Sequence, residues 1–547
     1  MKKCNIWYLT FVVFLLVSCG TIKPATAPEE ATREAATPEQ GGIARVRPRT
    51  LNPDELAVVF PAGDLELDFR RSFISSEAQI FTALYEGLFS YHPFTMEAVP
   101  GVAVRWELSE DRRQWTFILR SDARYSNGDL VVAEHFRSAW LSLLDPAKEA
   151  PYASLFDIIE GARDFRLGNN RDPNSVAVTA RDDHTLIVRL NHPAPFFRSM
   201  LCHHAFSPIH PSMLDNPDWS SPVSNGAFYI SSHDEFEMVL NKNPYYWDEA
   251  NVSLSRLILV FADDAEDATE LWNSGDVRWI TGGMAHLDKL TDRSGIRIDP
   301  LFATHYYFIR SEEAPWSDHR VSRALALALQ WEELRAGYHL PAETLIYPLW
   351  GYPRVTGIST GDIETAVSLL ASAGFPMGEG LPPLVIRLTP SYDARRIGLL
   401  MASAWTKLGI QVQIETVPFA EYFQSLREGG YVVGSSTWIG DFADPYTFLH
   451  MWRQASTLND AHHTDEEFER LMERSMSEEG ERRMATLAEA EHILLYNGTV
   501  LPIAHSLAIN IISMDEIEGW FPNALGIHPF KYLAFRRFSP LPYVAAR

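Results

Sequence analysis

The stretch LVIRLTPSYDARRIGLLMASAWTKLGIQVQIETVPFAEYFQSLREGGYVVGSSTW, residues 384–438, decides the fold class because it alternates strand and helix patterns. Short β-rich runs predict strands over 384–388, 411–417 and 431–438, and a helix over 419–426 precedes the last strand. Strands that alternate with helices in this way usually pair in parallel, with helices on both faces of the sheet. The stretch therefore predicts an α/β fold with a mostly parallel sheet.

The segment between the first two of these strands carries the apolar stripe of a helix. Apolar residues recur at helical spacing on one face, and the helix is predicted to end at Gly409; the stripe consists of Ile397, Leu400, Met401, Ala404, Trp405 and Leu408. Upstream, Asp362 is placed to cap a helix that runs to Ala373 and stops at Gly374. Both helices support the same α/β prediction.

Length and charge set broad limits on the class of protein. At 547 residues the chain is long enough for two or three structural units, and 46% hydrophobic residues with 22% charged residues are typical of a soluble protein. Asp and Glu number 71 against 47 Lys and Arg, which gives a formal net charge of -24. This balance argues against nucleic-acid binding, which needs clustered positive charge, and is typical of a solvated surface.

The N-terminus has the pattern of an export signal. Two lysines precede an apolar run, 6–17, that is too short for a mature membrane span. Small residues before a cysteine resemble the lipobox of bacterial lipoproteins, which implies a signal peptide over 1–18 and a lipid on Cys19. The alternative is an ordinary secretory signal with an incidental cysteine. Residues 19–48, rich in Pro, Ala, Thr and Glu, are predicted to be a flexible tether.

The remaining cysteines and apolar runs fit a body outside the cytoplasm, held to a membrane only by that lipid. No further apolar run reaches membrane-spanning length. Cys4 leaves with the signal and Cys19 carries lipid, so Cys202 has no partner for an intrachain disulfide. Because Cys202 stands in an apolar stretch without a cysteine-enzyme signature, we expect a buried structural thiol rather than a nucleophile.

Motifs for catalysis, nucleotide binding and metal binding are absent from the sequence. We find no phosphate loop, nucleophile elbow, zinc helix or calcium loop. The pairs His203-His204 and His462-His463 are predicted to be structural, since neighbouring side chains on a strand or helix point apart. The chain is therefore predicted to have no catalytic activity, no metal and no cofactor.

A series of short motifs, taken in order along the chain, resembles one known family. They are LYEGL (84–88), VPGVA (99–103), WTFILR (115–120), SNGD (126–129), SNGAF (224–228), NPYYW (243–247), THYYF (304–308), DHRVSRAL (318–325) and WIGDFADP (438–445). Each motif alone is unspecific. Their shared order resembles the extracytoplasmic solute-binding proteins of family 5, the oligopeptide- and dipeptide-binding lipoproteins of peptide ABC transporters.

The resemblance implies a two-lobed α/β fold, of the periplasmic-binding-protein type II, cluster C, in which a hinge closes the lobes over the ligand like a Venus flytrap. It also implies an additional domain inserted in the first lobe. The expected limits are lobe I over 49–90, 207–301 and 520–547, the inserted domain over 91–206, and lobe II over 302–519.

The resemblance further implies a receptor that captures oligopeptides and hands them to a membrane permease with cytoplasmic ATPases, as a monomer in the periplasm or at the cell surface. The peptide is expected to lie extended and to pair its backbone with the protein. Alternatives stay open: a receptor for a dipeptide, a murein peptide, nickel or a sugar, a surface adhesin or sensor, and, with less support, an extracytoplasmic hydrolase.

The motif at 438–445 supplies the first candidate site residues. By the resemblance, Asp441 accepts the ammonium group at the peptide N-terminus, while Asp444 and Pro445 fit the start of the next helix and leave Asp441 free. Trp438 is expected to form a flat wall for the peptide, with a buried core tryptophan as the alternative. Gly440 is expected to let a ligand approach the backbone closely.

Further candidates come from the other lobe. Ser75, Ser76 and Glu77 precede a predicted helix from Ala78 and, by the resemblance, offer strand-like pairing; Asn225 lies in the matching SNGA loop.

One departure concerns the peptide carboxylate. Residues 434–437 read GSST where some relatives place a basic residue for that group. Arg310, Arg323 and His305 are conceivable substitutes, although helix-surface or supporting roles are favoured for each.

Overall fold

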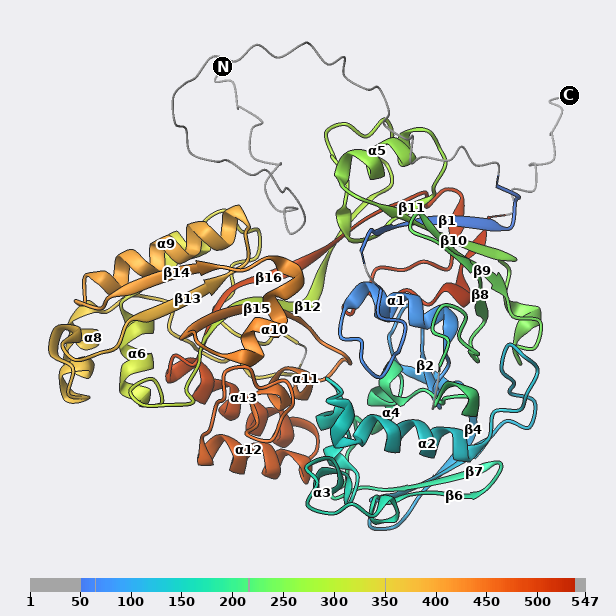
Figure 1. Cartoon of the computed structure of the whole chain (residues 1–547), viewed down its shortest axis with the longest axis horizontal. Helices are drawn as coiled ribbons and strands as arrows, with labels where there is room; N and C mark the ends of the chain where they lie inside the picture. Colours follow the sequence, from blue (N-terminus) through green and yellow to red (C-terminus); the bar gives the residue numbers. More distant parts are fainter. Residues whose placement is uncertain (1–50, 64, 215–216, 350, 537–547) are drawn as a thin grey trace, which may run out of the picture.

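The computed structural model describes residues 51–63, 65–214, 217–349 and 351–536. Within these residues, the largest element is a ten-stranded sheet that passes through both halves of the molecule (Figure 1). In spatial order its strands are β14 (Val412–Thr416), β13 (Leu384–Leu388), β15 (Val433–Ile439), β12 (Ile296–Ile309), β16 (Val500–Ile512), β11 (Trp279–Ile280), β1 (Glu55–Pro61), β10 (Arg256–Ala262), β9 (Glu237–Lys242) and β8 (Phe228–His233).

The sheet is mixed, which corrects the expectation of a mostly parallel one. β13 pairs in parallel with β14 and β15, as the decisive stretch predicts, and β1 pairs in parallel with β10 and β11. The pairs β12–β15, β12–β16, β11–β16, β9–β10 and β8–β9 are antiparallel. The chain enters the second half along β12 and leaves it along β16, so these two long neighbours must run in opposite directions.

β12 and β16 join the two halves of the sheet. The end of β12 at 303–309 pairs with β15 in one half, and the end of β16 pairs through Ile511 and Ile512 with β11 in the other. Between these ends the two strands pair with each other, with a register shift between Pro300 and Thr304. Figure 1 shows both strands crossing between the halves.

Helices pack beside the sheets and bury their apolar faces. The α-helices are α1 (Ser75–Leu84), α2 (Ala133–Leu144), α3 (Ala162–Arg166), α4 (Phe197–Met200), α5 (Ala265–Asn273), α6 (His319–Leu327), α7 (Trp331–Arg335), α8 (Ile363–Ser372), α9 (Tyr392–Thr406), α10 (Phe419–Glu428), α11 (Tyr446–Leu449), α12 (Glu466–Met476) and α13 (Gly480–Tyr496). Asp362 caps α8 by accepting from the Thr365 N–H, as predicted. The predicted stripe of α9 is confirmed at Ile397, Met401 and Trp405, which are buried in the core of the second half.

A second, four-stranded sheet lies beside the first half, at the lower right of Figure 1. It consists of β4 (Ala103–Leu108), β5 (Gln114–Leu119), β7 (Thr185–Arg189) and β6 (Val178–Asp182), all antiparallel. It falls inside the segment predicted as the inserted domain, while the limits of the three units stay a prediction. Small sheets pair β2 (Phe89–Tyr91) with β3 (Ala98–Pro100) and β17 (Ile517–Glu518) with β18 (Ala534–Phe535).

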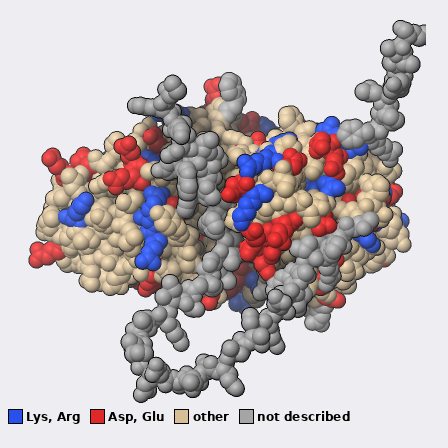
Figure 2. Space-filling model, turned by 90° about the horizontal axis from the view of Figure 1, so that it is seen from above, with Lys and Arg blue, Asp and Glu red and all other residues tan. Residues whose placement is uncertain are grey.

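The predicted signal peptide, tether and lipidated Cys19 lie outside the described residues. In the described part of the chain, no helix has the length and apolar character needed to cross a membrane. On the face shown in Figure 2, acidic and basic side chains are interspersed.

Candidate functional site

A cavity of about 300 Å³ lies between the two halves. One side is built from α1, residues 85–91 and residues 202–207, and the other from α10, residues 436–441 and residues 451–461. Ligand pockets occupy roughly 300–1,000 Å³, so this volume suits a small or short ligand.

Asp441 lies on the cavity wall at the end of β15, as the sequence motif predicts, and both halves hold it in place. Tyr152 donates its hydroxyl to Asp441 Oδ1 (3.1 Å), and Thr447 donates to Oδ2 (3.2 Å). The Asp441 N–H donates to Thr447 Oγ1 (2.9 Å), and Tyr91 donates to the Asp441 carbonyl (2.9 Å). The carboxylate is thus oriented by neutral donors.

No lysine or arginine within the described residues forms an ion pair with Asp441. Its nearest ring nitrogen is His203 Nε2, 3.6 Å from Oδ1, and burial holds the pKa of His203 well below its usual range, so that this imidazole is neutral. Burial also raises the pKa of Asp441 to about 7, against the lowering effect of the hydrogen bonds from Tyr152 and Thr447. A carboxyl group in this state gains strongly from a cation that enters the cavity.

Trp438 belongs to β15, Gly440 follows directly after that strand, and both line the cavity. The half-buried Trp438 ring donates its Nε1–H to the Thr447 carbonyl (3.0 Å), which fixes the indole plane. A Cβ on Gly440 would lie 2.5 Å from a ring carbon of Phe302 and 3.0 Å from Thr447 Cγ2. The absent side chain at Gly440 therefore serves packing, and its role in ligand approach stays a prediction.

The segment 75–77 differs from its expected form. α1 begins at Ser75, so these residues form the first helical turn instead of an extended segment before a helix at Ala78. Ser75 lines the cavity, whereas Ser76 and Glu77 do not. Glu77 is buried and accepts hydrogen bonds from the Glu66 N–H (2.8 Å) and the Ser72 hydroxyl (2.5 Å). It thus fixes the preceding loop.

Asn225 also lies off the cavity wall. Its amide accepts from the Glu86 N–H (3.2 Å) and donates to the Glu86 carbonyl (2.8 Å). Both polar groups of this buried side chain are therefore used to hold the chain after α1.

The three suggested substitutes for a carboxylate-binding base do not reach the cavity wall. Arg310 pairs with Glu312, Arg323 lies over the Tyr496 ring (3.6 Å to its centroid), and His305 shares a hydrogen bond with Thr437 (3.1 Å). Arg427 of α10 is the one lysine or arginine among the described residues that lines the cavity. It was not identified from the sequence.

The histidine pair corrects another expectation. His203 and His204 do not point apart: their ring centroids are 4.0 Å apart, and both line the cavity. They stand where a 3₁₀ turn, His204–Phe206, begins, so neither strand nor α-helix alternation applies. Burial lowers the pKa of His204 to about 4. No cluster of three potential metal ligands occurs in the described parts of the chain.

Cys202 is half-buried and is not paired with any described cysteine. It lines the same cavity, and burial raises the pKa of its thiol.

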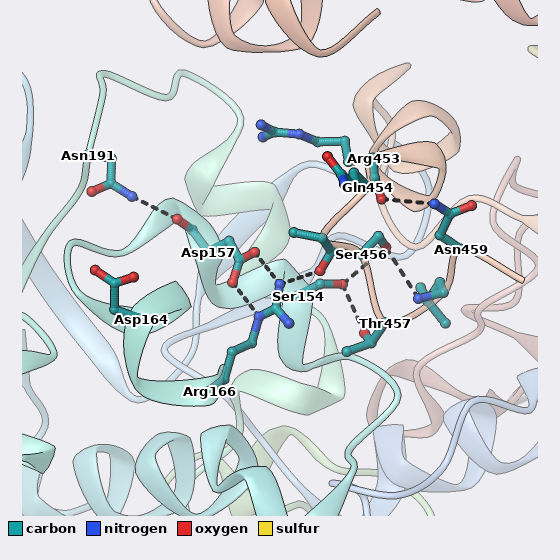
Figure 3. A network of polar contacts seen from close by, with 12 residues as sticks. Ser154, Asp157, Asp164, Arg166, Asn191, Arg453, Gln454, Ser456, Thr457 and Asn459 are labelled. Carbon is teal, nitrogen blue, oxygen red and sulfur yellow. Dashed lines mark hydrogen bonds and ion pairs between the residues drawn. The ribbon is translucent and has the colours of Figure 1, made fainter. Parts of the chain in front are cut away.

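A polar network joins the segment 154–191 to the segment 453–459, of which Thr457 also lines the cavity (Figure 3). Arg166 forms a buried ion pair with Asp157 and donates to the Ala455 carbonyl across the gap (2.5 Å). Thr457 donates to Ser154 Oγ (3.0 Å), although its single proton is shared with the Pro151 carbonyl (2.7 Å). These contacts hold the short helix Ala153–Ile158 against the segment after α11.

Comparisons with known proteins identify the family. Residues 97–460 match the family model of the bacterial extracellular solute-binding proteins, family 5 (middle). The chain is 28% identical over 467 residues to the periplasmic oligopeptide-binding protein OppA of Salmonella typhimurium, covering 80% of this chain and 84% of that protein.

Solved structures extend the likeness to the fold. The murein tripeptide binding protein MppA of Escherichia coli superposes with a TM-score of 0.77 at 25% identity, covering 88% of this chain and 99% of that one. The unliganded open form of MppA, also 25% identical, gives 0.63 and covers 89% and 98%. These likenesses confirm the predicted two-lobed α/β fold, and the present arrangement of the lobes is less similar to that open form.

Proposed function

Because this chain belongs to the bacterial extracellular solute-binding proteins of family 5, we propose that it captures short peptides in the cavity between its lobes and delivers them to the permease of an ABC importer. Members of this family bind solutes and are not enzymes. The relatives named above are an oligopeptide-binding and a murein tripeptide-binding protein, which supports a peptide as the ligand here.

Asp441 carries this proposal. A free peptide brings a positive ammonium group at its N-terminus, and Asp441 presents a buried carboxylate oriented by Tyr152 and Thr447 without a cation in contact. A charge-assisted pair in a closed cleft is worth about 2–5 kcal/mol when one partner is removed. Trp438 offers a flat apolar surface beside this point.

Binding and lobe closure are coupled in this mechanism. Asp441 comes from one half, and Tyr152 and Tyr91 reach it from the other, so the complete ammonium site exists only when the lobes are together. The ligand thus stabilises the closed form, which is the form that the permease and its ATPases would receive.

We further propose that the protein is a monomer that lipid on Cys19 anchors to a bacterial membrane, facing the periplasm or the cell surface. The lipobox-like sequence before Cys19 supports the anchor, and the family name supports the location.

The test is native mass spectrometry of residues 20–547 purified from a peptide-rich lysate, followed by titration with a defined tripeptide. We expect the wild type to carry a mixture of short peptides. Asp441→Ala should lose them and weaken tripeptide binding about 30-fold or more. Asp122→Ala, an exposed aspartate away from the cavity, is the matched control.

Two results would contradict the proposal. A single non-peptide mass bound to the wild type would show that the ligand is not a peptide. Equal peptide loading of the wild type and Asp441→Ala would remove Asp441 from the site.

A further inference from the structure

A second carboxylate, Asp460, lies on the cavity wall in the segment after α11. Its N–H donates to the Leu458 carbonyl (3.0 Å), and its own carbonyl accepts from the Tyr431 hydroxyl (3.2 Å). Its carboxylate, by contrast, accepts no hydrogen bond and forms no ion pair with any residue that the structure describes. Burial raises the pKa of this carboxyl group to about 6.

Aromatic rings build the wall on which Asp460 stands. Tyr306, Phe308 and Trp452 all line the cavity, with ring centroids 5.6 Å apart for Tyr306–Trp452 and 6.3 Å apart for Phe308–Trp452. Trp452 is 3% exposed, and its indole Nε1 finds no acceptor in the described part of the chain. The wall therefore combines π-faces, an unpartnered indole N–H and an unpartnered carboxylate.

The charges around Asp460 leave it open to a ligand. Arg310 lowers the pKa of Asp460, but its guanidinium is already occupied by Glu312 and by the Leu426 carbonyl (3.1 Å). Arg427 also lowers that pKa, yet it forms no ion pair with Asp460 and is largely exposed, with its guanidinium 5.7 Å from the Phe73 ring centroid.

The other acidic groups of the cavity are already accounted for. Glu86 is neutralised by Lys531 (2.7 Å) and accepts from Tyr246 and Trp247. Asp441 is assigned to the peptide ammonium under the proposed function. Asp460 is the remaining carboxylate on the cavity wall. Among the described residues, no hydrogen-bond donor contacts it and no partner is assigned to it.

We propose that Asp460, together with the rings of Tyr306, Phe308 and Trp452, forms a subsite for a positively charged side chain of the bound peptide. This inference rests on the proposed function and adds a specificity to it. A lysine or arginine side chain supplies the counter-charge that this half-buried carboxylate lacks, and its cation and alkyl stem gain from contact with aromatic faces. Peptides with a cationic residue at one fixed position are the substrate class.

The test uses tripeptides of alanine in which position 1, 2 or 3 carries either lysine or norleucine, which has a similar apolar stem and no charge. Isothermal titration with the wild type should show tighter binding of lysine than norleucine, by about tenfold or more, at one of these positions. Asp460→Asn should reduce that ratio to near one while leaving norleucine peptides unchanged. Asp122→Asn is the matched control.

A substitution of Arg427 should change the lysine-to-norleucine ratio in the opposite direction. Because its positive charge acts on Asp460 from a distance, Arg427→Gln should raise the lysine-to-norleucine ratio at the same position. Thermal melting of each variant checks that the fold is intact.

The possible failures are distinguishable. If all tripeptides bind but the lysine-to-norleucine ratio is the same in the wild type and Asp460→Asn, the subsite is overturned and the peptide-receptor function stands. If no tripeptide binds the wild type, the proposed function fails and the subsite fails with it.

Discussion

Asp441 and Asp444 stand in one short loop, yet their surroundings are opposite. Asp444 forms a two-point ion pair with Arg483 (2.7 and 2.8 Å) and accepts from the Tyr446 N–H (2.9 Å), which starts α11. Arg483 is 2% exposed and also packs over the Phe196 ring. Asp441 has hydrogen-bond donors but no cation in contact within the described residues.

The difference separates a structural carboxylate from the one that we propose binds the ligand. A buried charge that is paired inside the protein holds the fold and is unavailable for binding. A buried carboxyl with only neutral donors keeps a raised pKa and gains when a cation arrives. The residue type is the same for both, so the partners of each carboxylate decide its role.

The largest effect expected from this comparison is on stability. Asp444→Asn leaves the Arg483 guanidinium buried without its counter-charge, which should lower the free energy of unfolding by about 3–5 kcal/mol. Urea denaturation at pH 8 measures it. Asp441→Asn should cost less than about 1 kcal/mol, because it removes no ion pair. An equal loss of unfolding free energy in the two variants would contradict the distinction between Asp441 and Asp444.

The second expected effect is a pH dependence of binding that belongs to Asp441. Its pKa of about 7 in the closed cleft means that the carboxyl takes up a proton as the pH falls below 7, and a protonated carboxyl cannot pair with an ammonium group. Tripeptide affinity should therefore fall as the pH drops below 7, approaching tenfold per pH unit at the acid end, while above pH 7 the peptide's own ammonium group, with a pKa of about 8, begins to lose its proton and opposes a further rise. Titration calorimetry at several pH values measures the curve.

An N-acetylated tripeptide is the control, since it has no ammonium group and should bind weakly at every pH. A flat curve for the free tripeptide, or the same slope with the acetylated one, would assign the ammonium elsewhere.

The smallest expected effect comes from the hydroxyl that orients Asp441. Tyr152→Phe removes the donor to Oδ1 and should weaken tripeptide binding by about 0.5–1.5 kcal/mol. Because that hydrogen bond lowers the pKa of Asp441, its loss should also move the acid limb of the binding curve to higher pH. A weaker affinity with an unmoved limb would indicate that Tyr152 contacts the ligand and does not act through Asp441.

The sequence predicts the local elements of the second half well, since period and capping residues determine them. β13 at Leu384–Leu388 and the cap at Asp362 were predictable for this reason. Strand direction across the whole sheet was not, because β12 and β16 pair over a separation of about 200 residues that no local pattern encodes.

The site shows the same limit. Asp441 and Trp438 could be located from one motif, whereas Asp460 comes from another segment and carries no motif of its own. Tyr306 and Phe308 could have been predicted to lie on the same side of their strand, because alternate residues of a strand share a face, and both line the cavity. The sequence gives no way to tell that the Asn225 side chain bonds the backbone of Glu86, because a loop asparagine that bonds the backbone looks the same in sequence as one that binds a ligand.

The pairing of β12 with β16 limits the ways in which the two halves can move. Two strands that are hydrogen-bonded to each other and anchored at opposite ends in different halves can bend and twist together, but one half cannot slide along the other without breaking the ladder. Opening is thereby reduced to few degrees of freedom. A single distance between labels on the two cavity walls would then track the whole transition, and its time course would report capture and release as one coordinate.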